Sequence, residues 1–184
     1  MPLIMLYVPT SPILRSDAIV DLVGSADRFH SFFLAGGNNE KFMQYTKIQF
    51  AAQDGYSDED LKSIDFIESS IGAPIFSPKF KQLVNGKYNN SLELYPCEII
   101  KSKIVYNFYV GKIIQYENLI DVEKSRFRKL TDGRDVLMSP IYKEYVGNFF
   151  MARDSEFSHI YVCGEEFASF TRSNNLSISC KRVN

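Results

Sequence analysis

The sequence predicts an α+β fold, in which short helices pack on a mixed, mostly antiparallel sheet. Residues 75–100 and residues 159–183 each have the pattern strand, short helix, strand, which makes two β-α-β-like units. Residues 105–116 are rich in Val, Ile, Tyr and Phe, which is typical of a strand that pairs with the preceding one through a turn at residues 101–103. The length of 184 residues suits one domain, so we expect a single α+β domain over residues 1–184.

The elements expected before residue 75 follow from capping residues and hydrophobic spacing. Ser16 predicts the cap of a first helix, which would carry Val23 on its apolar face. Ser57 and Asp60 form a pattern like a capping box, and the apolar spacing behind them predicts a helix that continues to Ile71. Strands are expected at residues 3–8 and 46–52.

The first β-α-β-like unit is marked by clear boundary residues. Ser77 predicts an N-cap, Pro78 occupies the first helical position, where its missing N–H costs nothing, and Gly86 ends the helix. In the following strands Gly111 predicts a bulge, and residues 131–134 predict a turn. The other expected elements are strands at residues 145–152, 159–163 and 176–183 and a helix at residues 165–172.

The composition argues against several functional classes. The formal net charge of −1 lacks the basic excess that nucleic-acid binders usually carry, which makes nucleic acid an unlikely partner. The three cysteines have no short spacing and fit neither a disulfide framework nor a zinc site, so we expect them to be small buried hydrophobic residues. His30 and His159 have no metal-ligand spacing, and no nucleotide or nucleophile motif is present. We therefore expect no catalytic centre, no cofactor and no metal.

The apolar segments are too short for a membrane protein. Residues 1–8 are apolar but lack a preceding basic residue, and prolines follow them closely, which makes a poor signal peptide. No apolar run approaches the roughly 18 residues of a membrane span. We expect a cytoplasmic protein, and the sequence is compatible with a homo-oligomer.

A basic segment and an aromatic segment supply the candidate binding residues. Four cations lie between Lys124 and Lys129 with Phe127 among them, and Lys124 and Arg126 are the candidate contacts. Such a segment fits RNA or phosphate, with Phe127 stacking on a base, or a solvated strand edge whose charges resist association. The aromatic segment contains Tyr142, Tyr145, Phe149 and Phe150, and it adds Tyr142 and Tyr145 as candidate interface anchors.

Several short motifs follow one another through residues 75–183. They are Ile75-Phe76-Ser77, Phe80-Lys81-Gln82-Leu83, Leu92-Glu93-Leu94-Tyr95-Pro96, Phe108-Tyr109-Val110-Gly111-Lys112-Ile113, Ile120-Asp121-Val122-Glu123-Lys124-Ser125, Ile160-Tyr161-Val162, Phe167 and Asn174-Asn175-Leu176-Ser177-Ile178. Together they resemble the eleventh-numbered immunity family of bacterial polymorphic toxin systems, once catalogued as a domain of unknown function, and residues 1–74 carry no such resemblance. The resemblance includes Asp121 and Ser125 in an Asp-x-x-x-Ser motif, which we expect to be structural because both side chains can accept backbone N–H bonds.

The resemblance implies a cytoplasmic, non-enzymatic protein that binds and neutralises a cognate toxin protein. The toxin would be encoded beside it, and its active site would be blocked sterically or electrostatically. Two alternatives come from the residues: an RNA- or phosphate-binding module that uses the 124–129 basic segment, and a small enzyme with a dispersed site.

Overall fold

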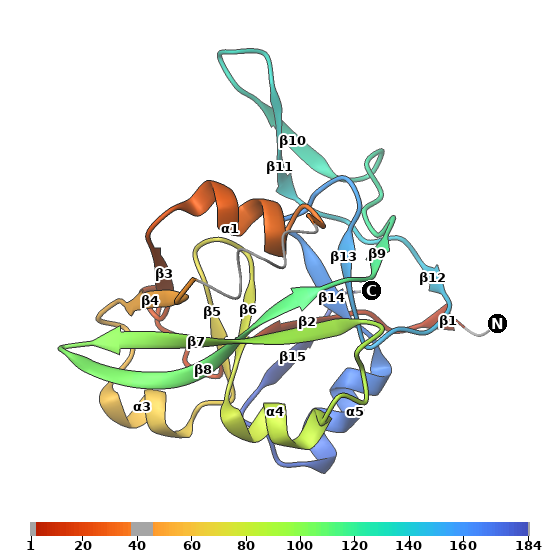
Figure 1. Cartoon of the computed structure of the whole chain (residues 1–184). Coiled ribbons are helices and arrows are strands. Elements are labelled where there is room, and N and C mark those ends of the chain that lie inside the picture. The colour runs from red at the N-terminus through yellow and green to blue at the C-terminus, as the bar shows by residue number, and fades with distance from the viewer. Residues whose placement is uncertain (1–2, 38–45, 184) are drawn as a thin grey trace.

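The computed structural model describes residues 3–37 and 46–183, and Figure 1 shows how two curved sheets and their helices are arranged. These residues are 17% helix and 39% strand, with mixed antiparallel sheets and 4 short helices. The α+β class predicted from the sequence is therefore confirmed.

The larger sheet has six strands in the order β3-β4-β7-β8-β6-β5, and every neighbouring pair is antiparallel except β4 and β7. An isolated parallel bridge between Val20 and Ser69, with a hydrogen bond of 3.0 Å from Ser70 N to Val20 O, joins the two ends of this order. The sheet therefore curls toward a closed barrel. Its strands are β3 (Val20–Val23), β4 (Gln49–Ala52), β5 (Phe66–Glu68), β6 (Pro74–Phe76), β7 (Leu92–Lys101) and β8 (Ile104–Ile113).

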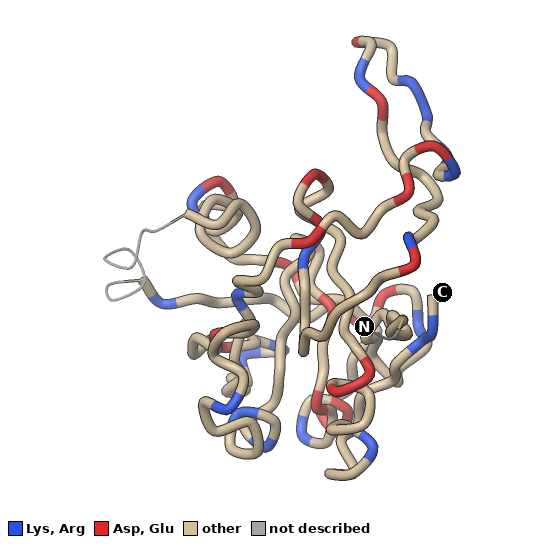
Figure 2. The backbone as a smooth tube through the Cα atoms, turned by 90° about the vertical axis from the view of Figure 1, so that its right-hand side faces the viewer, with Lys and Arg blue, Asp and Glu red and all other residues tan. Residues whose placement is uncertain are grey.

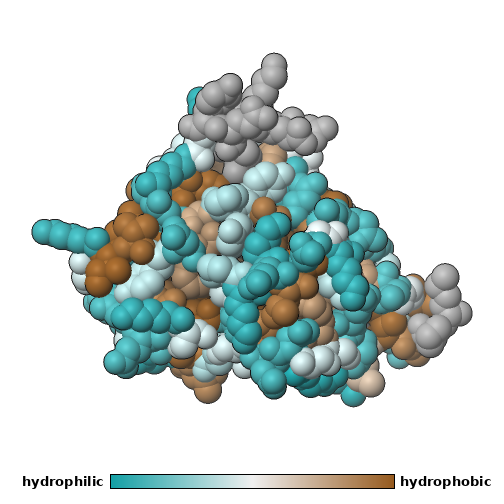
Figure 3. All heavy atoms as spheres, turned by 60° about the horizontal axis from the view of Figure 1, so that its bottom comes forward, coloured by the Kyte–Doolittle hydropathy of each residue, from teal (hydrophilic) through white to brown (hydrophobic). Residues whose placement is uncertain are grey.

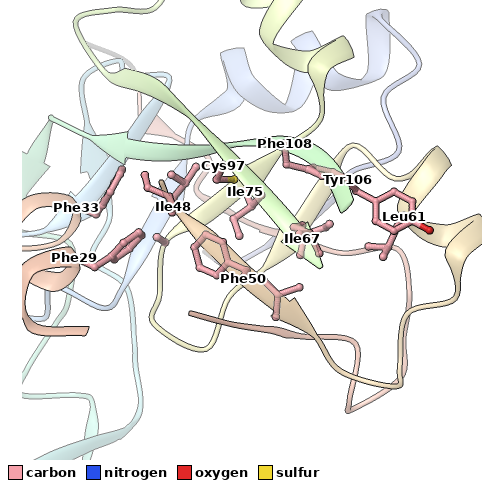
Figure 4. Packing of buried hydrophobic residues seen from close by; sticks show 14 of the residues in the cluster. Phe29, Phe33, Ile48, Phe50, Leu61, Ile67, Ile75, Cys97, Tyr106 and Phe108 are labelled. Atoms are coloured by element: carbon pink, nitrogen blue, oxygen red, sulfur yellow. The ribbon is translucent and has the colours of Figure 1, made fainter. Parts of the chain in front are cut away.

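The first hydrophobic cluster fills this curled sheet. Figure 4 shows its side chains pointing toward one another from several strands, with Phe50, Ile67 and Ile75 among them. Helix α1 (Ala26–Phe33) adds three buried phenylalanines, and α3 (Asp58–Ser63) adds Leu61. The stacked rings of Phe29 and Phe33, with centroids 4.2 Å apart, bring a large apolar area to this core.

The smaller sheet has five strands in the order β15-β2-β14-β13-β9, and only the β13–β9 pair is parallel. A second hydrophobic cluster joins the two sheets, because Phe76 and Ile113 of the larger sheet pack with Met151 and Cys163 of the smaller one. The strands are β2 (Tyr7–Thr10), β9 (Tyr116–Glu117), β13 (Met151–Asp154), β14 (Tyr161–Cys163) and β15 (Ser179–Arg182), and β1 (Leu3–Ile4) pairs separately with β12 (Tyr145–Val146).

The two expected β-α-β-like units have the same topology. In the first, α4 (Pro78–Val84) connects β6 to β7, and β8 lies between these strands, antiparallel to both. In the second, α5 (Glu165–Ser173) connects β14 to β15, and β2 lies between them, antiparallel to both. The two helices pack against each other through Phe80, whose ring centroid lies 5.9 Å from that of Phe170. N-terminal residues supply β2, β3, β4 and β5, so both sheets cross the boundary between residues 74 and 75.

Several local predictions were wrong. The single strands expected at residues 3–8 and 145–152 are each divided between two sheets, because β1 pairs with β12 while β2 and β13 belong to the five-stranded sheet. The helix expected after Ser16 is absent among the described residues, because residues 20–23 pair as β3 with β4. The helix that begins after Ser57 ends at Ser63 rather than near Ile71, since the next residues form β5 and pair with β6. Gly111 is not a bulge, because it pairs in continuous register with Leu94. A Cβ atom at Gly111 would lie 2.9 Å from Leu92 Cδ1, so glycine is needed for close packing.

The capping box at α3 was predicted correctly, and it supports a pH-dependent prediction. Asp60 accepts a hydrogen bond of 2.7 Å from Ser57 N, and this bond is the main cause that lowers the pKa of Asp60. We expect Asp60→Asn to cost about 1 kcal/mol of unfolding free energy at pH 7. Because the pKa is lower in the folded state, the contribution is complete above the unfolded pKa and is lost as pH falls through the folded pKa.

The gap in stability between wild type and Asp60→Asn should therefore narrow between pH 7 and pH 3. Urea unfolding at several pH values measures it, with Asp54→Asn as the control because Asp54 is exposed and precedes the cap. A gap that stays constant over this range would contradict the assignment.

None of the helices in the described parts of the chain is both long and apolar enough to cross a membrane.

Candidate functional site: a projecting hairpin

A two-stranded hairpin stands out from the body of the molecule. Strands β10 (Arg126–Lys129) and β11 (Asp135–Ser139) pair only with each other, in a sheet separate from the two main ones. Figures 1 and 2, which are related by a quarter turn, both show this hairpin extending beyond the rest of the fold. We call residues 121–142, the hairpin and its base, the arm.

The tip of the arm is a tight turn set by its own residues. Gly133 has φ +85°, a conformation that favours glycine, and its N–H donates to Leu130 O at 3.0 Å. Asp132 accepts from Arg134 N at 3.1 Å and forms an ion pair of 2.7 Å with the Arg134 guanidinium. The turn predicted over residues 131–134 is confirmed.

The base of the arm is held by the Asp-x-x-x-Ser motif. Asp121 N donates to Ile141 O at 2.8 Å, and Ser125 N donates to Asp121 O at 2.9 Å. The Ser125 hydroxyl accepts from Ile141 N at 2.9 Å. The Asp121 carboxylate accepts from Lys124 N at 3.2 Å and lies 3.0 Å from Lys124 Nζ, a contact that lowers the pKa of Asp121 and raises that of Lys124. These bonds join the two ends of the arm.

Removing the Ser125 hydroxyl should loosen the arm without unfolding the protein. Ser125→Ala leaves Ile141 N–H without its acceptor, which we expect to cost about 1 kcal/mol locally. Hydrogen exchange at the Ile141 amide and along β10 and β11 should become several-fold faster, while the thermal midpoint changes little. Ser139→Ala is the matched control, because Ser139 is exposed at the end of β11. Unchanged exchange in Ser125→Ala would show that the hydroxyl does not hold the base.

A buried carboxylate fixes the segment that leads into the arm. Asp154, only 1% exposed, accepts from Leu119 N at 2.9 Å and Ile120 N at 3.1 Å through one oxygen. Its other oxygen accepts from Glu156 N at 2.9 Å and Phe157 N at 2.8 Å. One side chain therefore sets the start of the arm relative to the β13–β14 loop.

The four candidate contact residues occupy two different environments. Lys124 and Arg126 are exposed, at the base and on the first strand of the arm. Tyr142 and Tyr145 are half-buried beside the third hydrophobic cluster. Tyr145 packs edge-on against Phe149 with ring centroids 5.1 Å apart, and burial, followed by a hydrogen bond with Glu117, raises its pKa to about 12. The structure therefore places Lys124, Arg126 and Tyr142 on the arm or its base, where Tyr142 is bridged to Ile120, whereas Tyr145 lies outside the arm and pairs with Ile4.

The other candidate sites are a surface groove, the cysteines and the side chains that could hold a metal ion. A groove of about 560 Å³ is lined by residues 46–48, which precede β4, by Pro78 and by residues of β7 and β8. These include Glu98, whose carboxylate pairs with Lys47 at 2.8 Å. Cys97 and Cys163 are buried, and Cys180 is half-buried. No group of three or more His, Cys, Asp or Glu side chains is placed to hold a metal ion within residues 3–37 and 46–183.

A buried arginine links two loops near the smaller sheet. Arg153 is inaccessible to solvent, and its Nη1 donates to the carbonyl oxygens of Gly72 and Ser158. Its guanidinium lies over the ring of Tyr161, 5.3 Å from the centroid. These contacts of Nη1 and the ring fix the loops around β14, whereas Nε and Nη2 of Arg153 are buried with no hydrogen-bond partner within residues 3–37 and 46–183.

The sequence interpretation missed the shape of the arm and the part that Asp154 plays in it. The signal for the hairpin was present, because an Asp-Gly turn at residues 132–133 lies between two runs with β-formers, Phe127 and Val136. No local signal marks the link from Asp154 to the arm. Its donors Glu156 N and Phe157 N are two and three positions away, but Leu119 N and Ile120 N are 35 and 34 positions away.

Comparison with known proteins gives no assignment: no protein-family model matches the chain, and no curated protein matches it.

Proposed function

We propose that this protein is a cytoplasmic immunity protein that binds and neutralises a cognate toxin protein without catalysing a reaction. The observation that carries the proposal is the projecting arm, which offers apolar side chains to a partner on a preorganised scaffold. The resemblance of residues 75–183 to an immunity family suggests that the partner is a toxin protein.

The distribution of exposed apolar residues supports a contact surface on the arm. Five of the thirteen large exposed hydrophobic residues of the described chain lie within the 22 residues of the arm. Exposed apolar groups that gather on one element often mark a protein interface, because a partner can remove them from water. They are Val122, Phe127, Val136, Met138 and Ile141, each between 38% and 56% exposed.

A second projecting end carries fewer such residues. At the turn between β7 and β8, Ile104 and Val105 are about half exposed. Figure 3 shows hydrophobic residues at that end, on the left, beside a mostly hydrophilic surface. The arm is the larger candidate and projects further from the body (Figure 1).

The fixed base makes the arm suitable for insertion into a concave site. Binding costs less entropy when the contacting segment is already ordered, and the bonds of Asp121, Ser125 and Asp154 provide this order. A hairpin that enters the active-site cleft of a toxin would exclude its substrate sterically. This mechanism requires no catalytic residue in the immunity protein.

A growth assay combined with co-purification tests the proposal. The toxin-like protein encoded beside this chain is expressed in a bacterial host with and without it. We expect the toxin alone to stop growth, and co-expression to restore growth together with a stable complex. Continued lethality with no complex, or rescue without a complex, would contradict neutralisation by binding.

A further inference from the structure

The two faces of the arm differ in what they contact. Phe127 and Leu137 are directly opposed and share the inner face, where the ring of Phe127 lies 6.0 Å from that of Phe157 in the β13–β14 loop. Arg128 and Val136 are opposed on the other face, because side chains alternate along a strand. Arg126 lies two positions before Arg128 on β10, where the register shifts between Arg126 and Phe127, and strand alternation along β10 places it on that same side. We call Arg126, Arg128 and Val136 the outer face.

The outer face carries positive charge that the described part of the protein does not neutralise. Lys124 is paired with Asp121 and Arg134 with Asp132, so their charges are balanced locally. Neither Arg126 nor Arg128 takes part in an ion pair within residues 3–37 and 46–183, and both are exposed. Figure 2 shows the Lys and Arg positions along the arm.

We propose that the outer face receives an acidic segment of the partner protein, with partner carboxylates on Arg126 and Arg128 and an apolar partner side chain on Val136. This inference rests on the proposed function and adds the chemistry of the partner. Guanidinium groups bind carboxylates through two parallel N–H···O bonds, which makes arginine well suited to this contact. Met138, 56% exposed beside the register shift, extends the apolar part.

Nucleic acid fits this surface less well than an acidic protein. The aromatic ring available for base stacking, Phe127, lies on the inner face against Phe157, and the outer face offers the aliphatic Val136 instead. Nucleic-acid binders usually carry a basic excess, whereas residues 121–141 contain five cationic and four acidic side chains, a net charge of only +1. A second copy of the chain is also disfavoured, because two outer faces would bring like charges together.

Charge reversal on the outer face provides the test. Binding of the purified toxin domain is measured for wild type and for Arg126→Glu/Arg128→Glu at 50 mM and 300 mM salt. We expect the double variant to bind about 100-fold more weakly than wild type at 50 mM salt. The affinity of wild type should decrease between 50 mM and 300 mM salt, whereas that of the double variant should not. Both positions are exposed, so the thermal midpoint should be unchanged.

The matched control is Lys62→Glu/Lys103→Glu, which makes the same change in net charge at exposed positions on α3 and the β7–β8 turn. It should bind within about 3-fold of wild type, because both sites are distant from the arm (Figure 1). Equal loss in the two double variants would overturn the inference, since net charge alone would then explain it.

The outcomes separate this inference from the proposed function. If wild type does not bind the toxin domain, the proposed function fails, and the inference fails with it. If wild type and the outer-face variant bind equally, the inference is overturned while the proposed function stands. Salt-sensitive binding of a single-stranded RNA 20-mer, or dimerisation in light scattering, that is abolished only in the outer-face variant would show that the face serves RNA or a second copy.

Discussion

Replacing Asp154 by Asn is expected to destabilise the protein by about 3 kcal/mol, although the side chain keeps its shape. The two carboxylate oxygens of Asp154 accept two backbone N–H groups each. An asparagine amide can accept only through its oxygen, and its NH2 group would face the other pair of donors. Two N–H groups would then lose their acceptor, and the other two would bond to a neutral amide oxygen instead of a charged carboxylate.

Chemical denaturation followed by circular dichroism measures this effect, and Asp132→Asn is the control. Asp132 is exposed at the tip of the arm and pairs with Arg134, so its substitution should change stability by less than about 0.5 kcal/mol. The Asp154→Asn protein should also bind the toxin domain more weakly, because the start of the arm at Leu119 loses its anchor. A destabilisation below about 1 kcal/mol would show that water replaces the carboxylate easily.

Replacing Phe80 by Ala is expected to cost about 4 kcal/mol, because the ring joins the two β-α-β-like units. Phe80 is completely buried and stacks on Phe76 of β6 with centroids 4.0 Å apart. It also contacts Phe167 and Phe170 of α5 at 6.0 Å and 5.9 Å. The substitution leaves a cavity between α4 and α5 and removes aromatic contacts from both units.

The same helix supplies the control for this prediction. Leu83 lies on the same helix but is 37% exposed, so Leu83→Ala should cost about 1 kcal/mol or less. The destabilisation caused by Phe80→Leu should lie between those of Phe80→Ala and Leu83→Ala. Two separate unfolding transitions of Phe80→Ala, by fluorescence and circular dichroism, would show that removing this ring uncouples the two units. A cost no larger than that of Leu83→Ala would contradict the prediction.

The sequence by itself determined the elements whose signals are local. The caps at Ser57 and Ser77, the proline at the first position of α4 and the long β7–β8 pair were all readable, because their hydrogen bonds and backbone preferences lie within a few residues. The two strand-helix-strand units followed from these signals. The Asp-Gly turn marked the tip of the arm in the same way.

Only the tertiary structure decided which long-range partners the remaining segments have. Residues 20–23 and 66–68 carry apolar residues at helical spacing, yet they are strands, because pairing with β4 and β6 satisfies their backbone groups and buries their side chains. The curling of the larger sheet depends on the bridge from Val20 to Ser69, 49 positions apart.

The candidate site divides in the same way. Its basic residues and the Asp-x-x-x-Ser motif were visible in the sequence, but the outer face of the arm depends on the register of Arg128 with Val136 and on the contact of Phe127 with Phe157. Asp154 acquires two of its donors, Leu119 N and Ile120 N, only when the β13–β14 loop and the segment that leads into the arm meet. A sequence specifies such side chains, but the direction in which they point is set by strand pairing and by contacts between distant segments.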